Sequence, residues 1–81
     1  MTANPEPRVF RASDGEPMNE VLADFIGEVV TVRLKDGRIR WGRLQPEVLD
    51  DYELVLPDTG APLVSFHRQD VVELVDWSGQ P

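Results

Sequence analysis

The segment of residues 30–44, VTVRLKDGRIRWGRL, constrains the fold more than any other part of this 81-residue chain. Its two halves alternate apolar and polar side chains, which is typical of half-buried strands. They meet at Asp36-Gly37, a dipeptide that favours a two-residue type I′ turn and hence a β-hairpin. This turn predicts three cross-strand pairs: Leu34 with Ile39 and Val32 with Trp41 on an apolar face, and Arg33 with Arg40 on the other face.

The length of the chain allows one small domain. Residues 1–16 are polar and proline-rich and predict a flexible N-terminal tail, residues 17–76 predict the folded domain, and residues 77–81 predict a C-terminal tail from which Trp77 can fold back. A domain of this size buries only about 60% of its unfolded surface. Cysteine is absent, so disulfides are excluded. Self-association is the remaining common source of stability, and we expect a homo-oligomer.

A short helix over residues 17–26 is predicted, because Met18, Val21, Leu22 and Phe25 recur at helical spacing. Five short strands with tight connections follow, at residues 28–34, 38–44, 52–56, 63–67 and 71–75. Gly42, inside the second strand, predicts a bulge or a sharp bend. The expected fold is therefore mostly β, with a short N-terminal helix followed by a strongly bent five-stranded antiparallel barrel.

Charge is distributed unevenly along the chain. The net charge is −7, yet residues 33–43 contain five basic side chains and one acidic side chain. Seven of the eight basic residues are arginine, which binds phosphates and stacks on bases. A GC-rich genome would produce the same arginine bias, so both explanations stay open. The arginines can equally pair with carboxylates on neighbouring strands.

The order of one helix and five strands, together with specific residues, resembles the Sm-like (LSm/Hfq) family. The resemblance covers residues 18–75, although similar alternation occurs in other SH3-like barrels, including the C-terminal domain of the ribosome-maturation factor RimP. It implies an Sm-like (SH3-like) barrel with the helix on an open end, and a ring of five to seven subunits sealed by pairing between the fourth and fifth predicted strands. The matching residues are Gly27, Val30-x-Val32-x-Leu34, Asp36-Gly37, Gly42-x-Leu44 and Leu54-Val55-Leu56, with Val71-Val72-x-Leu74 as a second motif.

The same resemblance implies an RNA-binding pocket at the pore of the ring. The candidate residues are Tyr52, Glu53, His67 and Arg68. Glu53 stands where the family has asparagine, and a carboxylate repels phosphate and cannot donate a hydrogen bond to a base. His67-Arg68, or Arg68-Gln69, stands where the family has Arg-Gly.

A second, electrostatic RNA surface is predicted at Arg33, Arg38 and Arg40. Trp41 is expected in the core or an interface rather than stacked on a base, because its predicted neighbour is Val32. The expected function is RNA-associated binding without catalysis, with single-stranded RNA as a partner. The alternative is a protein-interaction or assembly module on the same barrel that binds no nucleic acid.

Several classes of function lack support in the residues. His67 is the lone histidine, and no cysteine or nucleophile motif accompanies it, so no enzyme is expected. Asp50, Asp51 and Glu53 lack EF-hand spacing and are expected in a solvated loop, so no metal or other cofactor is predicted. No apolar run approaches the ~20 residues of a membrane span, and the first residues show no apolar signal region. A cytoplasmic location without membrane contact is expected.

Overall fold

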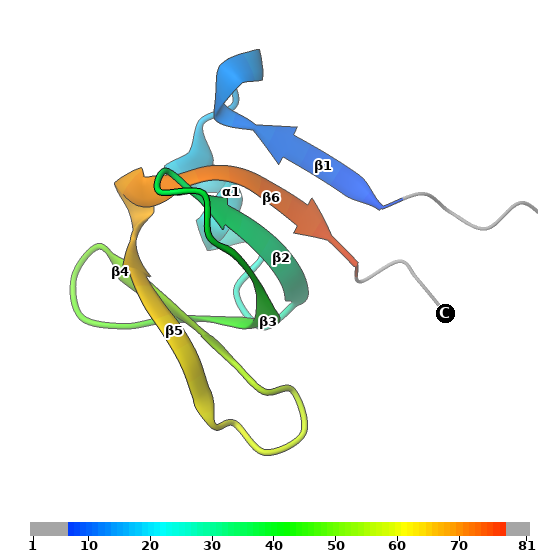
Figure 1. Cartoon of the computed structure of the whole chain (residues 1–81), viewed down its shortest axis with the longest axis vertical. Helices are drawn as coiled ribbons and strands as arrows, with labels where there is room; N and C mark the ends of the chain where they lie inside the picture. Colours follow the sequence, from blue (N-terminus) through cyan, green and yellow to red (C-terminus); the bar gives the residue numbers. More distant parts are fainter. Residues whose placement is uncertain (1–6, 78–81) are drawn as a thin grey trace, which may run out of the picture.

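The computed structural model of the chain describes residues 7–77 and shows a curved antiparallel sheet with one helix packed against it (Figure 1). The six strands lie side by side in the order β1-β6-β2-β3-β4-β5. The elements are β1 (Arg8–Arg11), the 3-10 helix η1 (Ala12–Asp14), α1 (Met18–Asp24), β2 (Val29–Leu34), β3 (Ile39–Pro46), β4 (Asp51–Val55), β5 (Pro62–His67), the 3-10 helix η2 (Arg68–Asp70) and β6 (Val71–Asp76).

The prediction of a five-stranded barrel is wrong, because the sheet has six strands and is not closed. β1 and β5 are its two ends and do not pair with each other. The additional strand, β1, comes from the segment that the sequence placed in a tail. It runs antiparallel to β6 over four residue pairs, from Arg8 opposite Asp76 to Arg11 opposite Glu73. With β1 on one side and β2 on the other, neither edge of β6 is free.

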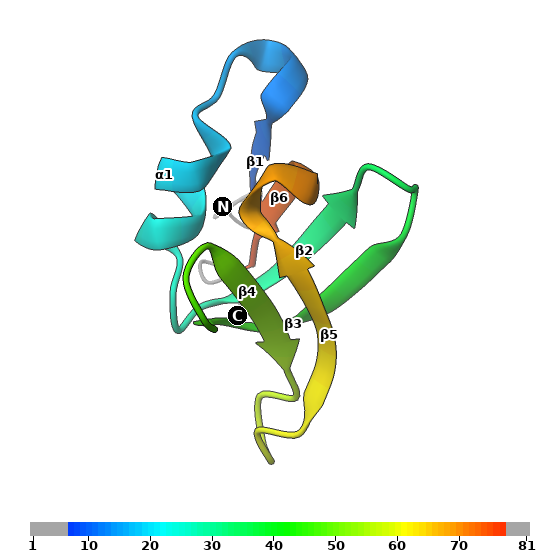
Figure 2. The same cartoon turned by 90° about the vertical axis from the view of Figure 1, so that its left-hand side faces the viewer.

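Figure 2 shows α1 beside the curved sheet. The core is formed by buried residues of α1 and of the inner face of the sheet. The predicted helical stripe is confirmed, because Met18, Val21, Leu22 and Phe25 are all buried. From the sheet, the core receives Val30, Val32, Leu34, Leu44, Leu54, Phe66, Val71 and Leu74. The alternation of apolar residues along each strand therefore places one face against the helix and leaves the other face outside.

Besides its pairing with β6, β1 is held to the domain by a half-buried ion pair and by two contacts with the ring of Phe25. The Arg8 guanidinium donates to Oδ2 of Asp76 from Nε at 3.1 Å and from Nη2 at 2.8 Å. The Asp76 side chain is almost completely buried, whereas that of Arg8 is largely exposed. Arg8 also lies over the ring of Phe25, 5.1 Å from its centre, and Phe10 contacts the same ring at a centroid distance of 5.3 Å.

The β2–β3 hairpin has a different turn from the predicted one. A type I′ turn requires positive φ at both central residues, but only Gly37, at 91°, has it, and Asp36 does not. The loop instead spans Lys35 to Gly37, closed by the amide of Leu34 donating to the carbonyl of Arg38 at 2.9 Å. The extra loop residue shifts the pairing by one position. Val32 therefore lies opposite Arg40, Arg33 opposite Ile39, and Thr31 opposite Trp41.

Within this loop, the pKa of Asp36 lies below its usual value, chiefly because the backbone N–H of Arg38 donates to its carboxylate. A carboxyl group with a lowered pKa in the folded state stabilises the fold above its unfolded-state pKa, and this contribution is lost as the pH falls through the folded-state pKa. We expect an NMR titration to show Asp36 protonating at lower pH than a free aspartate, and a lowered pKa to persist in Arg38→Ala, which keeps the backbone donor. An ordinary or raised pKa for Asp36 would contradict this assignment.

The sequence predicts a bulge or a sharp bend at Gly42, and this glycine does not form a bulge, since its pairing with Val30 is regular. It lies where β4 and β5 bend over β3. A β-carbon at this position would lie 2.7 Å from the carbonyl oxygen of Val55, 3.2 Å from Cβ of Leu54 and 3.3 Å from Cδ1 of Leu63. The glycine is therefore required by the close approach of a neighbouring backbone.

Candidate functional site

The outer face of the sheet carries a largely apolar row that crosses four strands, with Thr31 as its one polar member. The register places Val9 of β1 beside Val75 of β6, Val75 beside Thr31 of β2, and Thr31 beside Trp41 of β3. The sequence predicts Trp41 in the core or in an interface. It is 48% exposed, so it does not lie in the core, and the one-residue shift of the hairpin is the cause. A row of this kind is a surface on which another molecule can pack.

Trp77 extends this row beyond the end of β6. Its backbone N–H donates to the carbonyl of Val29 at 3.2 Å, and its indole Nε1 donates to Oγ1 of Thr31 at 2.7 Å. The sequence-based expectation that Trp77 can fold back is therefore confirmed. The indole remains 37% exposed although its N–H is satisfied, so its ring is available for an apolar contact.

A charged row runs beside the apolar one on the same face. Arg11, Glu73, Arg33 and Ile39 lie side by side on β1, β6, β2 and β3. The carboxylate of Glu73 is shared, with Nε of Arg11 at 2.8 Å and Nη2 of Arg33 at 3.7 Å. Ile39, at the end of this row and next to Trp41, is 59% exposed. We call the residues Val9, Ile39, Trp41, Val75 and Trp77 the outer apolar patch.

The three arginines of the predicted electrostatic surface do not share one face. Arg33 lies on the outer face and pairs with Glu73. Arg38 is in the turn and pairs with Asp36 at 2.7 Å. Arg40 is opposite Val32, on the other face, where its Nη1 donates to the carbonyl of Ile39 at 2.8 Å. Two of the three charges are thus balanced within the protein, which weakens a continuous phosphate-binding surface.

The four residues of the predicted pore pocket lie at one end of the β4–β5 hairpin but in different surroundings. Tyr52 is paired with Phe66, stacks on its ring at 6.4 Å and packs against the core. Glu53, opposite Ser65, and His67, opposite Asp51, alternate with Tyr52 and therefore face away from it. Of the four residues, Arg68 lines a cavity.

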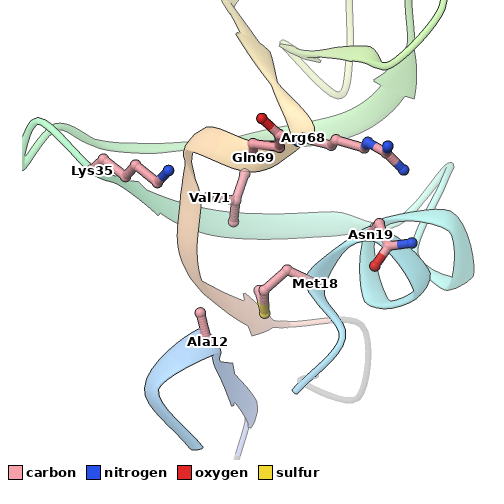
Figure 3. A pocket seen from close by; sticks show the side chains of 7 residues that line it. All are labelled: Ala12, Met18, Asn19, Lys35, Arg68, Gln69 and Val71. Carbon is pink, nitrogen blue, oxygen red and sulfur yellow. The ribbon is translucent and has the colours of Figure 1, made fainter. Parts of the chain in front are cut away.

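This cavity, of about 470 Å³, lies where the helix, the hairpin turn and η2 meet (Figure 3). Its polar groups are the amino group of Lys35, the guanidinium of Arg68 and the amides of Asn19 and Gln69. Lys35 lies on one side of Val71 and Arg68 on the other, with Met18 and Ala12 beneath. We call this cavity the basic pocket. Sequence reasoning identified Arg68 and missed the other lining residues, because they come from four separate segments.

Backbone hydrogen bonds fix the walls of the basic pocket. The N–H of Lys35 donates to the carbonyl of Asp70 at 2.8 Å, which holds the hairpin turn against η2. The N–H of Arg68 donates to the carbonyl of Asp50 at 3.0 Å. Nδ1 of His67 accepts a hydrogen bond from the N–H of Gln69 at 3.1 Å, so the histidine caps η2 rather than lining the cavity.

Arg68 has one unsatisfied donor. Its Nε is buried and has no hydrogen-bond partner within residues 7–77. The nearest carboxylate oxygen, Oδ1 of Asp50, is 3.7 Å away, close enough to balance charge but too far for a hydrogen bond. A buried donor without a partner costs free energy and favours any acceptor that can reach it.

Other kinds of site are not seen among the described residues. In that part of the chain, no three histidine or acidic side chains lie together as metal ligands would. Its single α-helix is too short and too polar to cross a membrane. The candidate sites are therefore two binding sites, the outer apolar patch and the basic pocket.

Comparison with protein-family models, with curated proteins and with solved structures gives no match, so the outer apolar patch and the basic pocket are the observations from which a function can be inferred.

Proposed function

We propose that this chain is a non-catalytic protein-interaction module that assembles through the outer face of its sheet. The observation that carries this proposal is the apolar row across β1, β6, β2 and β3, with Trp41 and Trp77 half-exposed on it. Tryptophan is enriched in the energetically important parts of protein interfaces. The indole N–H of Trp77 already donates to Thr31. A partner can therefore cover this indole without burying an unsatisfied donor.

A second copy of the chain is the occupant we propose. Two sheets can stack with their faces about 10 Å apart when apolar side chains meet between them. The charged row of the outer face contains Arg11, Glu73 and Arg33, which sum to +1, whereas the whole chain carries −7. Because this row is nearly neutral, it opposes the stacking of two copies only weakly.

The resemblance to the Sm-like family points instead to a ring with bound RNA. A ring sealed by pairing between β5 and β6 needs a free edge on β6, and β1 and β2 take both edges. Five arginines are also paired with carboxylates: Arg8, Arg11, Arg33, Arg38 and Arg68. These features favour the protein-interaction proposal over the RNA proposal.

The test is the oligomeric state of the purified chain. We expect sedimentation equilibrium to give a dimer with a dissociation constant in the micromolar range, and Ile39→Ser and Trp41→Ser each to raise that constant by about tenfold or more. Val48→Ser is the matched control, since Val48 is 73% exposed in the loop after β3 and lies off the outer face. This control is expected to leave the constant unchanged.

Two results would contradict the proposal. One is a monomer at all concentrations, and the other is a dimer that Ile39→Ser and Trp41→Ser do not weaken. Titration with U-rich and A-rich RNA, followed by tryptophan fluorescence at physiological salt, distinguishes the competing function. Submicromolar quenching that falls steeply with salt would assign the tryptophans to base stacking.

A further inference from the structure

We propose that the basic pocket is a binding site for a small molecule that carries a phosphate or carboxylate group on an apolar body. This site is separate from the outer apolar patch, and the inference does not depend on the proposed dimer. The cavity volume of about 470 Å³ lies within the range of small-molecule sites.

The charge in the pocket defines the class of ligand. Lys35 and Arg68 bring two cationic groups to one cavity, and Asn19 and Gln69 add neutral hydrogen-bonding amides. Among the described residues, the carboxylate that pairs with Arg68 is that of Asp50, 3.7 Å from Nε. Asp36 and Asp70 line a neighbouring hollow together with Lys35. Asp36 is already engaged by the backbone N–H of Arg38 at 3.0 Å and by its guanidinium at 2.7 Å.

The unsatisfied Nε of Arg68 is the second observation. A native protein leaves few buried donors without a partner, and each one requires an explanation, such as a water or ion that completes its hydrogen bonding. The Arg68 side chain as a whole is 36% exposed, so atoms other than this Nε are accessible to a ligand. An oxyanion can accept from a guanidinium with two oxygens at once, in a geometry that neutral groups cannot reproduce. Arg68 is therefore the residue that selects an anion.

The apolar lining defines the rest of the ligand. Met18 is 8% and Val71 3% exposed, so both belong to the core and offer only their outer surface to the cavity. Methionine adapts its shape to what it contacts. A ligand with a ring or short alkyl group beside its anionic group therefore covers this surface while its charge reaches Arg68 or Lys35.

We would test this site by following amide chemical shifts of the full chain during titration with phenyl phosphate, benzoate and benzyl alcohol. Phenyl phosphate is expected to perturb the amides of Asn19, Lys35, Gln69 and Val71. Benzoate is expected to bind more weakly at the same amides, since it carries less charge, and benzyl alcohol several-fold more weakly again. This order separates phosphate and carboxylate ligands from a merely apolar cavity.

Charge-removing variants complete the experiment. Arg68→Gln and Lys35→Gln are each expected to weaken phenyl phosphate binding by about tenfold, as loss of a charged hydrogen bond predicts. Arg40→Gln removes the same charge outside the pocket and is expected to change the affinity less than about twofold, in line with the small effect of an exposed charge. Arg68→Gln also removes the Arg68–Asp50 ion pair, and a melting curve shows whether this variant is still folded. Lys35→Gln leaves that pair intact, so the test does not depend on Arg68→Gln alone.

Three results would overturn the proposal. They are equal binding of benzyl alcohol and phenyl phosphate, perturbations that map outside the basic pocket, and affinities that a folded Arg68→Gln or Lys35→Gln variant leaves unchanged. The dimer test on the outer face has a different readout, so either inference can fail while the other stands.

Discussion

Replacing Gly42 with alanine is expected to destabilise the domain by about 2–3 kcal/mol, a typical cost for inserting a methyl group into a closely packed site. The added Cβ would lie 2.7 Å from the carbonyl oxygen of Val55. That oxygen belongs to the backbone of β4, which cannot move without disturbing the pairing of β3 with β4. Urea unfolding followed by circular dichroism measures the effect, with the midpoint falling and the slope unchanged.

Ser65→Ala is the matched control for Gly42→Ala, since Ser65 is an exposed residue of β5 and its substitution adds no atom to the interior. We expect its free energy of unfolding to stay within about 0.5 kcal/mol of the original chain. If Gly42→Ala unfolds at the same urea concentration as this control, the carbonyl oxygen of Val55 does not approach position 42 as closely as 2.7 Å from the added Cβ.

Replacing Arg8 with methionine is the second change with a large expected effect. Methionine keeps the length of the side chain but removes the two Arg8 donors to Asp76, whose side chain is buried with an exposed fraction of only 2%. Breaking a buried pair from one side typically costs 3–5 kcal/mol, and because Arg8 itself is largely exposed we expect about 2–3 kcal/mol here. Thermal unfolding measures the loss, at roughly 4–8 °C for each kcal/mol in a domain of this size.

Arg11→Met provides the control for Arg8→Met on the same strand. Arg11 pairs with Glu73 at the surface, and exposed pairs contribute about 0–1 kcal/mol. Hydrogen exchange adds a local readout, because loss of the Arg8 anchor should speed exchange of the amides in β1 before those in β2 and β3. A melting temperature for Arg8→Met that equals that of Arg11→Met would show that the buried carboxylate is satisfied without Arg8.

Local periodicity predicted most of the elements. The helical stripe from Met18 to Phe25 is buried as expected, and the five predicted strands agree with β2 to β6 to within a few residues at each end. These predictions succeed because the spacing of apolar residues within a segment is enough to indicate a helix or a strand.

The features that the sequence did not reveal depend on distant residues or on backbone angles. β1 has only four residues, and its partner β6 is more than sixty positions away, so nothing local marks Arg8–Arg11 as a strand. The φ of Asp36 determines which of two turns the hairpin adopts. The turn sets the pairing of β2 with β3, and that pairing determines whether Trp41 faces the core or the outside. The basic pocket exists only once the segments that carry Asn19, Lys35 and Arg68 have been brought together.

The two ends of the sheet differ in a way that bears on uncontrolled polymerisation. β1 is short and carries an arginine at each end, which discourages another strand from adding there. β5 carries no acid and no lysine or arginine between Pro62 and Phe66, and Leu63 is 46% exposed. If the β5 strands of two copies pair with each other, the result is a closed dimer. If β5 of one copy pairs with β1 of the next, the same contact can repeat without end and build a fibre. The short length of β1 and its two arginines thus work against fibre growth, and neutral residues in place of Arg8 and Arg11 are expected to weaken this protection.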